Sequence, residues 1–240
     1  YMKNVLYYIF AIIISICIIN QYIELIDYVT LKRTHPPNLP LVDTKDDFLS
    51  PKECKELKEY IHNNKLLNRE WEWCDIIHFN TSENSKKMFF KNNLEKIYEI
   101  FEKIKQPGTN AYIVNTAIIS NSHNANKNKA IDGHYDDSIE MRDRLGRKIL
   151  PVCTTVIYVS LPKDYKGGEL FLSPFGSKHI DKFKSPYKPK EGRKLTFRGD
   201  MYHFVTPYFC DDHTEKRISL VFEQYNIPDK YDTEFKIRKR

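Results

Sequence analysis

The hydrophobic period of the chain changes near residue 111, and this change limits the fold more than any other feature of the sequence. Before it, apolar residues recur at helical spacing; after it, β-rich runs are separated by turn residues. The β-rich runs are Ala111 to Ser120, Val152 to Leu161, Glu169 to Leu172, Lys194 to Phe197 and Arg217 to Tyr225. Helices followed by strands predict an α+β domain whose β part closes into a sandwich or barrel.

Two stretches of the first half are predicted to be helical. Residues Ser50 to Glu53 (SPKE) have the pattern of a capping box with proline at the first helical position, and a helix of about four turns should follow. A second helix is indicated by apolar residues at helical spacing: Met88, Leu94, Ile97, Phe101 and Ile104. It is expected to end before Pro107-Gly108. We expect both apolar stripes to pack into the core.

The N-terminal segment is strongly apolar. Val5 to Ile19 is interrupted only by Ser15, and the apolar character continues less purely to Val29. Because the pure run is shorter than the roughly 20 residues of a spanning helix, the core of a signal peptide is the competing interpretation. No small-residue cleavage site follows, so we predict one uncleaved transmembrane helix that contacts the membrane through residues 5–29. Basic residues flank both ends and leave its orientation open.

The 240 residues are predicted to form four segments. Residues 1–30 are the transmembrane anchor, residues 31–44 a Pro-rich linker, residues 45–228 one folded domain and residues 229–240 a basic C-terminal tail. This layout describes a single-pass membrane protein. The sequence leaves the endoplasmic reticulum, an organelle inner membrane and a viral envelope equally open.

Charge and cysteine content exclude several classes of protein. The 38 basic and 32 acidic residues give a net charge of +6 that is spread along the chain, so we predict no nucleic-acid partner. The cysteines are Cys17, Cys54, Cys74, Cys153 and Cys210. No C-x-x-C pair is present, which excludes a zinc ribbon and a thioredoxin motif. Disulfides and thiols both remain open for the four cysteines that follow the apolar segment.

A candidate metal site is indicated by His134-Tyr135-Asp136, an H-x-D motif whose outer side chains would project to the same face of a β-strand. We predict His203, on a late strand of the same barrel, as the third ligand. Two histidines and one carboxylate bind Fe(II) and leave positions open for a chelating cosubstrate and O2. A second H-x-D, at residues 179–181, lies in a Lys-rich stretch without a strand pattern and is interpreted as surface.

Further motifs follow the first H-x-D in a fixed order. They are the strand Thr154 to Ser160, Gly167-Gly168-Glu169, the P-x-x-G-x-x-L-x-F stretch from Pro189 to Phe197, His203 with Pro207, and Arg217-Ile218-Ser219. In this order they resemble the prolyl 4-hydroxylase-like branch of the 2-oxoglutarate- and Fe(II)-dependent dioxygenases, over roughly residues 130 to 225. The resemblance implies a double-stranded β-helix, a jelly-roll-like core with the N-terminal helices packed outside it.

The resemblance also implies roles for individual residues. The three predicted ligands would hold Fe(II), and Arg217 would pair with the distal carboxylate of 2-oxoglutarate. Ser219 would add a hydroxyl donor to the same carboxylate, and Tyr158 matches a position whose phenol can reach it. Thr154 also occupies a family position, without an assigned contact. Lys216 is the alternative anchor; we prefer Arg217 because it begins a strand whose polar and apolar residues alternate.

The activity implied by the resemblance is hydroxylation of a protein side chain, with release of succinate and CO2. Peptidyl proline is the leading target and lysine an alternative, so the expected partner is a protein or peptide substrate. Fe(II), 2-oxoglutarate and O2 are the expected cofactor and cosubstrates, and ascorbate is a further candidate. A second hypothesis is a catalytically silent scaffold or accessory subunit of a larger membrane complex, for example in an organelle inner membrane.

Overall fold

The computed structural model describes residues 12–19, 40–68, 75–120, 130–139, 148–174, 186–212, 214–227 and 234–238. The chain divides into two units, Tyr1–Leu39 and Pro40–Arg240. In the first unit residues 12–19 are helical. Within the described residues, no helix combines the length and the apolar character that crossing a membrane requires. Most of the predicted anchor lies outside the described residues, and the anchor stays a prediction.

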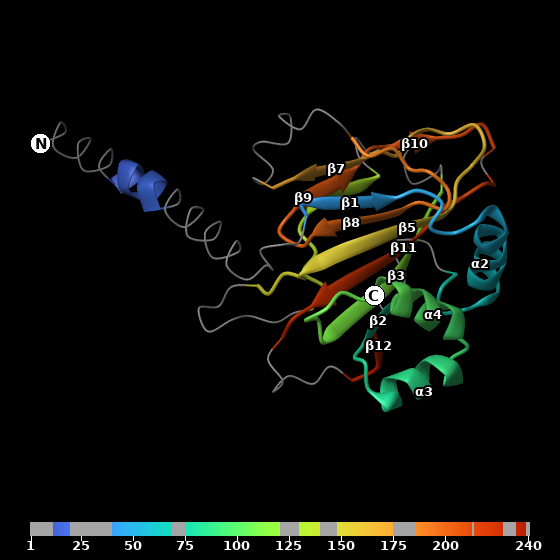
Figure 1. Ribbon diagram of the computed structural model, residues 1–240. Helices are drawn as coiled ribbons and strands as arrows, with labels where there is room; N and C mark the ends of the chain where they lie inside the picture. Colours follow the sequence, from blue (N-terminus) through green and yellow to red (C-terminus); the bar gives the residue numbers. More distant parts are fainter. Residues whose placement is uncertain are drawn as a thin grey trace, which may run out of the picture. The chain divides into compact units, whose positions relative to one another are not determined.

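Antiparallel strands dominate the second unit (Figure 1). The large sheet contains, in spatial order, β1 (Val42–Lys45), β8 (Lys194–Arg198), β5 (Cys153–Ser160), β11 (Arg217–Tyr225), β3 (Ala111–Ile119), β2 (Ile76–Phe79) and β12 (Lys236–Arg238). A smaller sheet contains β4 (Ile131–His134), β9 (Tyr202–Val205) and β7 (Leu170–Ser173). A third pair joins β10 (Tyr208–Phe209) to β6 (Lys166–Gly167). This arrangement is consistent with the predicted jelly-roll core.

The β-rich runs of the sequence correspond to β3, β5, β7, β8 and β11, each within one residue at either end. The prediction of a strand-rich second half is therefore confirmed. The sequence did not indicate the shorter strands β1, β2, β6, β10 and β12, and of β9 it indicated only that His203 lies on a late strand. These strands have two to four residues, which is too few for alternation to stand out from chance.

Strand β11 lies in the middle of the large sheet, between β5 and β3. Its even-numbered residues from Ile218 to Phe222 belong to the core on the helical side. Its odd-numbered residues from Arg217 to Glu223 line a cavity on the opposite side. The two-faced strand predicted from the sequence is thus confirmed, and it separates the core from the candidate site.

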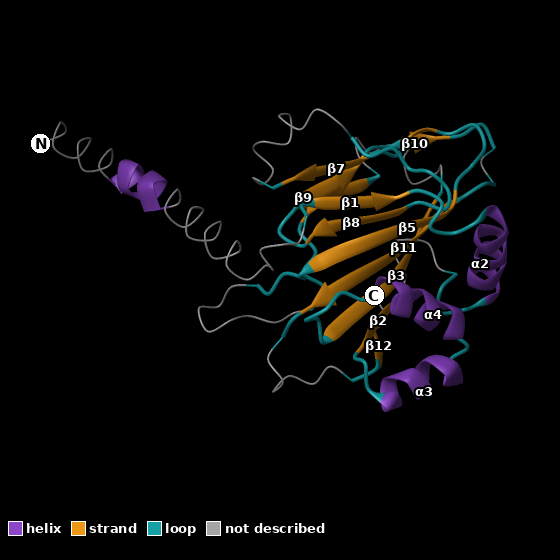
Figure 2. Cartoon of the chain, viewed as in Figure 1, coloured by secondary structure: helices purple, strands orange, loops and turns teal. Residues whose placement is uncertain are grey.

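Helices α2 (Pro51–Asn63), α3 (Glu83–Lys91) and α4 (Glu95–Ile104) lie together on one side of the large sheet (Figure 2). The capping box is confirmed, because the backbone N–H of Glu53 donates to Ser50 Oγ and the backbone N–H of Ser50 donates to Glu53 Oε2 at 2.7 Å. The apolar stripes are core, as predicted, except at Met88, which is half-buried and lies outside the cluster. The buried members are Cys54, Leu57, Ile61, Leu94, Ile97, Phe101 and Ile104.

The single second helix expected from the sequence is wrong, because two helices occupy that stretch. Helix α3 ends at Lys91, and Asn92 caps it. Asn93 then adopts a φ of 54°, a left-handed conformation that breaks the helical hydrogen-bond series and that asparagine tolerates better than most residues. Helix α4 starts again two residues later with the same apolar face toward the core.

A second core fills the space between the two larger sheets. It contains Val156, Tyr158, Leu170, Leu172, Leu195, Phe197, Met201 and Val205, which come from β5, β7, β8, β9 and the turn before β9. Cys17, Cys54, Cys153 and Cys210 carry thiols rather than disulfides, and Cys74 lies outside the described residues. This core closes one side of the cavity that holds the candidate site.

The sheet extends past the predicted domain limits of residues 45–228 at both ends. Strand β1 begins at Val42 and pairs with β8. Strand β12 lies in the predicted basic tail and pairs with β2, with Lys236 opposite His78. Charged residues at a sheet edge discourage pairing with further chains. The described part of the tail is therefore the edge strand of the large sheet.

Candidate metal centre and adjoining pocket

The structure brings together the three predicted ligands, His134, Asp136 and His203. Strand β4 pairs with β9 so that His134 stands opposite His203. Asp136 Oδ1 lies 3.6 Å from the Nε2 atom of each histidine, and one ligand atom from each residue lies within 4.8 Å of the others. The cluster joins segments that are far apart in the sequence, so only folding creates it.

The expectation that both side chains of the H-x-D motif project from one strand is wrong. Strand β4 ends at His134, and Asp136 lies beyond it. The β4–β9 pairing also shifts register between Ile131 and His134, and such irregularities turn side chains away from the regular alternation. Asp136 reaches the cluster from the segment that leaves the strand.

Backbone carbonyls orient both imidazoles. His134 Nδ1 lies 2.7 Å from the carbonyl oxygen of Asp132, and His203 Nδ1 lies 3.1 Å from that of Met201. A carbonyl only accepts hydrogen bonds, so each Nδ1 carries the hydrogen and each Nε2 keeps a lone pair for a metal. Histidine ligands of metals are oriented in this way in general.

Thr154 orients the carboxylate. Its Oγ1 donates to Asp136 Oδ2 at 2.6 Å, which leaves Oδ1 to face the two histidines. Burial raises the pKa of Asp136, but the two neighbouring histidines and the hydrogen bond from Thr154 outweigh it and hold that pKa below its usual range. Asp136 is therefore an ionised ligand at neutral pH. The sequence indicates Thr154 as a family position but does not indicate this contact.

The pKa values of the two histidines shift in opposite directions. Burial lowers the pKa of His134, but the adjacent Asp136 carboxylate outweighs burial and raises that pKa. Burial dominates at His203 and lowers its pKa, so the imidazole is neutral. Two imidazole nitrogens and one ionised carboxylate match Fe(II) sites with open positions. Zinc uses the same donor types, so the donor set alone leaves both metals open.

The cluster lies at a cavity of about 110 Å³, which is room for several water molecules. Arg217, Ser219 and Tyr158 line the same cavity. Arg217 is 4% exposed, and its guanidinium carbon lies 5.4 Å from the centre of the Tyr158 ring. Within the described residues, Arg217 Nε and Nη1, Ser219 Oγ and Tyr158 Oη have no hydrogen-bond partner.

These unsatisfied groups form a candidate anion site. A buried guanidinium and two buried hydroxyls without partners are costly unless a ligand satisfies them. A carboxylate suits Arg217 because the planar guanidinium can donate two parallel hydrogen bonds. Lys216, the alternative anchor of the sequence analysis, is not among the described residues that line the cavity. The structure therefore places Arg217 where the sequence predicts it, and its role in binding stays a prediction.

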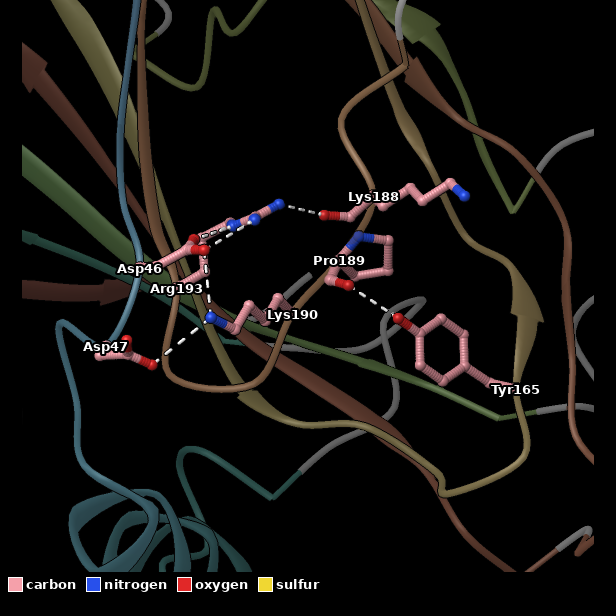
Figure 3. Close-up of polar contacts among 7 residues, drawn as sticks. All are labelled: Asp46, Asp47, Tyr165, Lys188, Pro189, Lys190 and Arg193. Atoms are coloured by element: carbon pink, nitrogen blue, oxygen red, sulfur yellow. Dashed lines mark hydrogen bonds and ion pairs between the residues drawn. The ribbon is translucent and has the colours of Figure 1, made fainter.

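The P-x-x-G stretch holds the backbone next to Tyr158. Figure 3 shows Arg193 and Lys190 paired with Asp46, and Tyr165 donating to the carbonyl oxygen of Pro189. Arg193 Nε lies 2.5 Å from Asp46 Oδ1, and its hydrogen bond lowers the pKa of Asp46 to about 2. These contacts fix the loop that precedes β8. They are structural, and none of them lies in the cavity.

Gly192 explains why this stretch needs a glycine. Its φ is +79°, and a Cβ at this position would overlap the carbonyl oxygen of Leu49. The Gly192 N–H donates to the carbonyl oxygen of Tyr158 at 2.9 Å, while its own carbonyl accepts from Leu49. The glycine of the P-x-x-G motif therefore has a structural role: it supports strand β5, which carries Tyr158, and it does not line the cavity.

Two further polar residues of the cavity were missed by the sequence analysis. Asn115 on β3 is buried, and its Oδ1 has no partner among the described residues. Glu223 on β11 is 2% exposed, and burial, followed by the charge of Asp136, raises its pKa to about 7. The alternation of β11 places Glu223 on the same face as Arg217 and could have indicated it.

Three predicted features lie outside the described residues, and nothing tests them. They are the second H-x-D at residues 179–181, most of the Pro-rich linker of residues 31–44, and Cys74. Within the described part of the chain, the three ligands above are the one group of metal-binding side chains.

Comparisons with known proteins give similarity of fold only. No protein-family model matches the chain, and no curated protein matches its sequence. A viral collagen prolyl hydroxylase from Paramecium bursaria Chlorella virus-1, in complex with 2-oxoglutarate, is 18% identical with a TM-score of 0.45; the match covers 78% of this chain and 97% of that chain. A Pseudomonas putida prolyl-4-hydroxylase is 16% identical with a TM-score of 0.44, over 84% and 98% of the two chains.

A third similar structure is an oxidoreductase of the 2-oxoglutarate-Fe(II) oxygenase family from Burkholderia pseudomallei. It is 13% identical with a TM-score of 0.42, and the match covers 84% of this chain and 89% of that chain. At these identities and scores the function of the chain has to be argued from its own site.

Proposed function

We propose that the chain is an Fe(II)- and 2-oxoglutarate-dependent dioxygenase that hydroxylates a protein side chain. The observation that carries the proposal is one cavity that contains a cluster of two histidines and one carboxylate and a buried arginine whose Nε and Nη1 have no partner among the described residues. Neither feature is sufficient alone, because zinc accepts the same donors and arginine pairs with many anions. Together they fit a cosubstrate that chelates the metal at one end and carries a carboxylate at the other.

We assign metal binding and cosubstrate binding to separate groups of residues in the cavity. His134, Asp136 and His203 would hold the metal, with Thr154 and two backbone carbonyls fixing their orientation. Arg217, with two neighbouring hydroxyls, would hold the distal carboxylate of the cosubstrate. The apolar cavity walls would exclude water from the space between. When bound, Fe(II) supplies, with 2-oxoglutarate and O2, the oxidising power for hydroxylation.

The test is an anaerobic titration of the full chain with Fe(II) and 2-oxoglutarate. A chelated 2-oxo acid on Fe(II) gives a visible charge-transfer band, which we expect in the wild type and not in His134→Ala. A folded wild-type protein that never gives the band would overturn the proposal. The band is recorded without substrate, so the result does not depend on knowing the target.

The scaffold hypothesis is the less favoured alternative. A barrel that has lost catalysis has no reason to keep three ligands, a hydroxyl that orients one of them and a buried basic anchor in a single cavity. Co-purification distinguishes the two functions. A chain recovered only in a stable membrane assembly, without bound metal, would favour the scaffold.

Two finer parts of the function rest on the sequence. The motif order favours peptidyl proline as the target, and lysine is the alternative; hydroxylation of neither Pro-rich nor Lys-rich peptides, despite turnover of 2-oxoglutarate, would exclude both. The apolar run of residues 5–29 supports attachment to a membrane. Flotation of the full chain with lipid vesicles, and its loss when residues 1–30 are deleted, is the expected result.

A further inference from the structure

Glu223 is a buried carboxyl group in the cavity that the proposed reaction does not use. It lies on the face of β11 that also carries Arg217 and Ser219, and it lines the same cavity as the metal cluster. In the large sheet it stands opposite Thr154, the residue whose hydroxyl orients Asp136. Glu223 is therefore at the metal end of the cavity, and Arg217 is at the other end of the strand.

Two hydroxyl groups hold the Glu223 carboxyl in one orientation. Ser138 Oγ donates to Oε1 at 2.5 Å, and Tyr225 Oη donates to Oε2. The backbone N–H of Ser138 also donates to this carboxylate. Its two oxygens can together accept four hydrogen bonds, so acceptor capacity remains. A buried carboxylate that is held in one orientation and can still accept a hydrogen bond has the properties of a preorganised binding group.

With metal and cosubstrate bound, the charges in the cavity would leave Glu223 without a cation, because Asp136 and one carboxylate of 2-oxoglutarate would balance the two charges of Fe(II). Among the described residues that line the cavity, Arg217 carries the one permanent positive charge. It lies six positions along the strand, about 20 Å away at the usual rise per residue, and the proposed cosubstrate would neutralise it. Asp137, another acid of the cavity wall, is already paired with Lys148. A buried carboxylate without a counter-charge is unfavourable.

We propose that Glu223 recognises a positively charged group of the substrate, so that the side chain that enters the cavity is basic, lysine or arginine, rather than proline. The inference rests on the proposed function and names its substrate class. In that reaction O2 and 2-oxoglutarate convert a C–H bond to C–OH; one oxygen atom enters the substrate, and the other enters succinate as CO2 leaves. An ammonium or guanidinium donor occupies the remaining acceptor capacity of Glu223.

The experiment uses peptide pools with identical randomised flanks and a central Lys, Arg, Pro or norleucine. Norleucine has the length of lysine without its charge. Binding to the full chain loaded with Mn(II) and 2-oxoglutarate is measured under argon, and succinate release is measured with Fe(II) and O2. We expect the Lys or Arg pool to bind about tenfold or more tightly than the norleucine pool, and the two basic pools to show which side chain is preferred.

Glu223→Gln keeps the size and planar shape of the side-chain end group, but it removes the charge and replaces one acceptor oxygen with an NH2 donor. We expect this variant to lose the preference for the basic pool and to keep the charge-transfer band. Asp137→Asn is the matched control, since it removes an acid of the same wall that Lys148 already neutralises; its preference should equal that of the wild type. Should Glu223→Gln not fold, Ser138→Ala removes one orienting donor and should reduce the preference by a few-fold.

The outcomes separate the two proposals. A wild type that lacks the band overturns the proposed function. A wild type that gives the band but binds norleucine or proline pools as well as basic ones overturns the inference alone. The inference also fails if Glu223→Gln retains the full preference, because Glu223 would then only secure Ser138 and Tyr225.

Discussion

Single hydroxyl groups decide how the residues of this site face one another. Asp136 has two equivalent oxygens, and only the hydrogen bond from Thr154 determines which of them points to the histidines. The same strand carries Thr155, whose hydroxyl lies 3.0 Å from that of Thr196 on a neighbouring strand. Adjacent threonines thus serve two different contacts, because successive side chains of a strand point to opposite faces.

Thr154→Val should weaken metal binding by about 10- to 100-fold, because the variant keeps the volume of the side chain but releases the Asp136 carboxylate. Calorimetric titration with Mn(II) measures this effect. Thr155→Val is the matched control and should bind the metal as the wild type does. Equal affinities for both variants would show that Thr154 does not orient the ligand.

Arg217→Met should weaken 2-oxoglutarate binding by about 10- to 100-fold, since it removes charge-assisted hydrogen bonds to a carboxylate. Metal affinity should be unchanged, because Arg217 is not part of the metal cluster. Lys216→Met is the control for the alternative anchor. If Lys216→Met weakens 2-oxoglutarate binding and Arg217→Met does not, the assignment of the anchor is wrong.

At the scale of elements, the pairing of β4 with β9 positions two of the three ligands. Gly133 precedes His134 on β4, and Tyr202 precedes His203 on β9. A Cβ at Gly133 would overlap Tyr202 Oη and would lie 2.5 Å from the ring carbon Cζ. The Tyr202 ring therefore lies directly against the backbone at Gly133, where any side chain would have to displace it.

Gly133→Ala should destabilise the protein by about 1 kcal/mol and weaken metal binding, because the added methyl group displaces the ring of Tyr202, which is adjacent to the ligand His203. Denaturant unfolding and Mn(II) titration measure the two effects. The double variant Gly133→Ala with Tyr202→Ala has room for the methyl group and should regain metal binding. Failure of this rescue would argue against a steric cause.

His78 on β2 makes the edge of the large sheet sensitive to acid. Its pKa is lowered to about 4 by burial and then by the charges of Arg238 and Lys236 on β12. The unfolded chain takes up a proton near pH 6.5, so between pH 6.5 and 4 the unfolded state binds more protons than the folded state. The contribution of His78 to the free energy of unfolding is therefore fully present above pH 6.5 and is lost as the pH falls toward 4.

His78→Gln should remove this part of the acid sensitivity. We expect the urea midpoint of the wild type to fall more than that of the variant as the pH is lowered through that window. A wild type and variant with parallel pH dependence would show that His78 is protonated without loss of stability. The measurement concerns the sheet edge, which lies away from the cavity.

At the scale of the whole molecule, the site connects the two larger sheets. Its residues come from β4 and β9 of the small sheet and from β3, β5 and β11 of the large sheet. A ligand that binds all of them binds the folded state and has no equivalent partner in the unfolded chain. Occupancy of the site should therefore stabilise the complete barrel.

Mn(II) at about 100 times its dissociation constant should add about 2.7 kcal/mol to the stability, which is a rise in melting temperature of about 5 to 10 °C for a domain of this size. A chelator should reverse the rise. His134→Ala should show no rise, since it lacks a ligand. A melting temperature that does not respond to metal in the wild type would contradict the assembled site.

Much of the candidate site could be predicted from the sequence, because some of its residues lie in local sequence patterns. The H-x-D spacing, the late His203 and the alternation along β11 each identify a residue type at a defined place. Thr154 and Glu223 were not assigned roles, because a threonine or glutamate within a strand has no distinctive local pattern. The break at Asn93 was also missed, since the apolar spacing continues across it.

The sequence by itself determined the strand-rich second half, the capped first helix, the two faces of β11 and the residue types of the metal cluster. Only the tertiary structure decided that Asp136 reaches the histidines from beyond its strand, that Thr154 orients it, and that Glu223 shares the cavity with Arg217. The reason is physical. Alternation and capping arise between residues a few positions apart, whereas the register of β4 on β9 and of β11 on β5 depends on how distant strands pack.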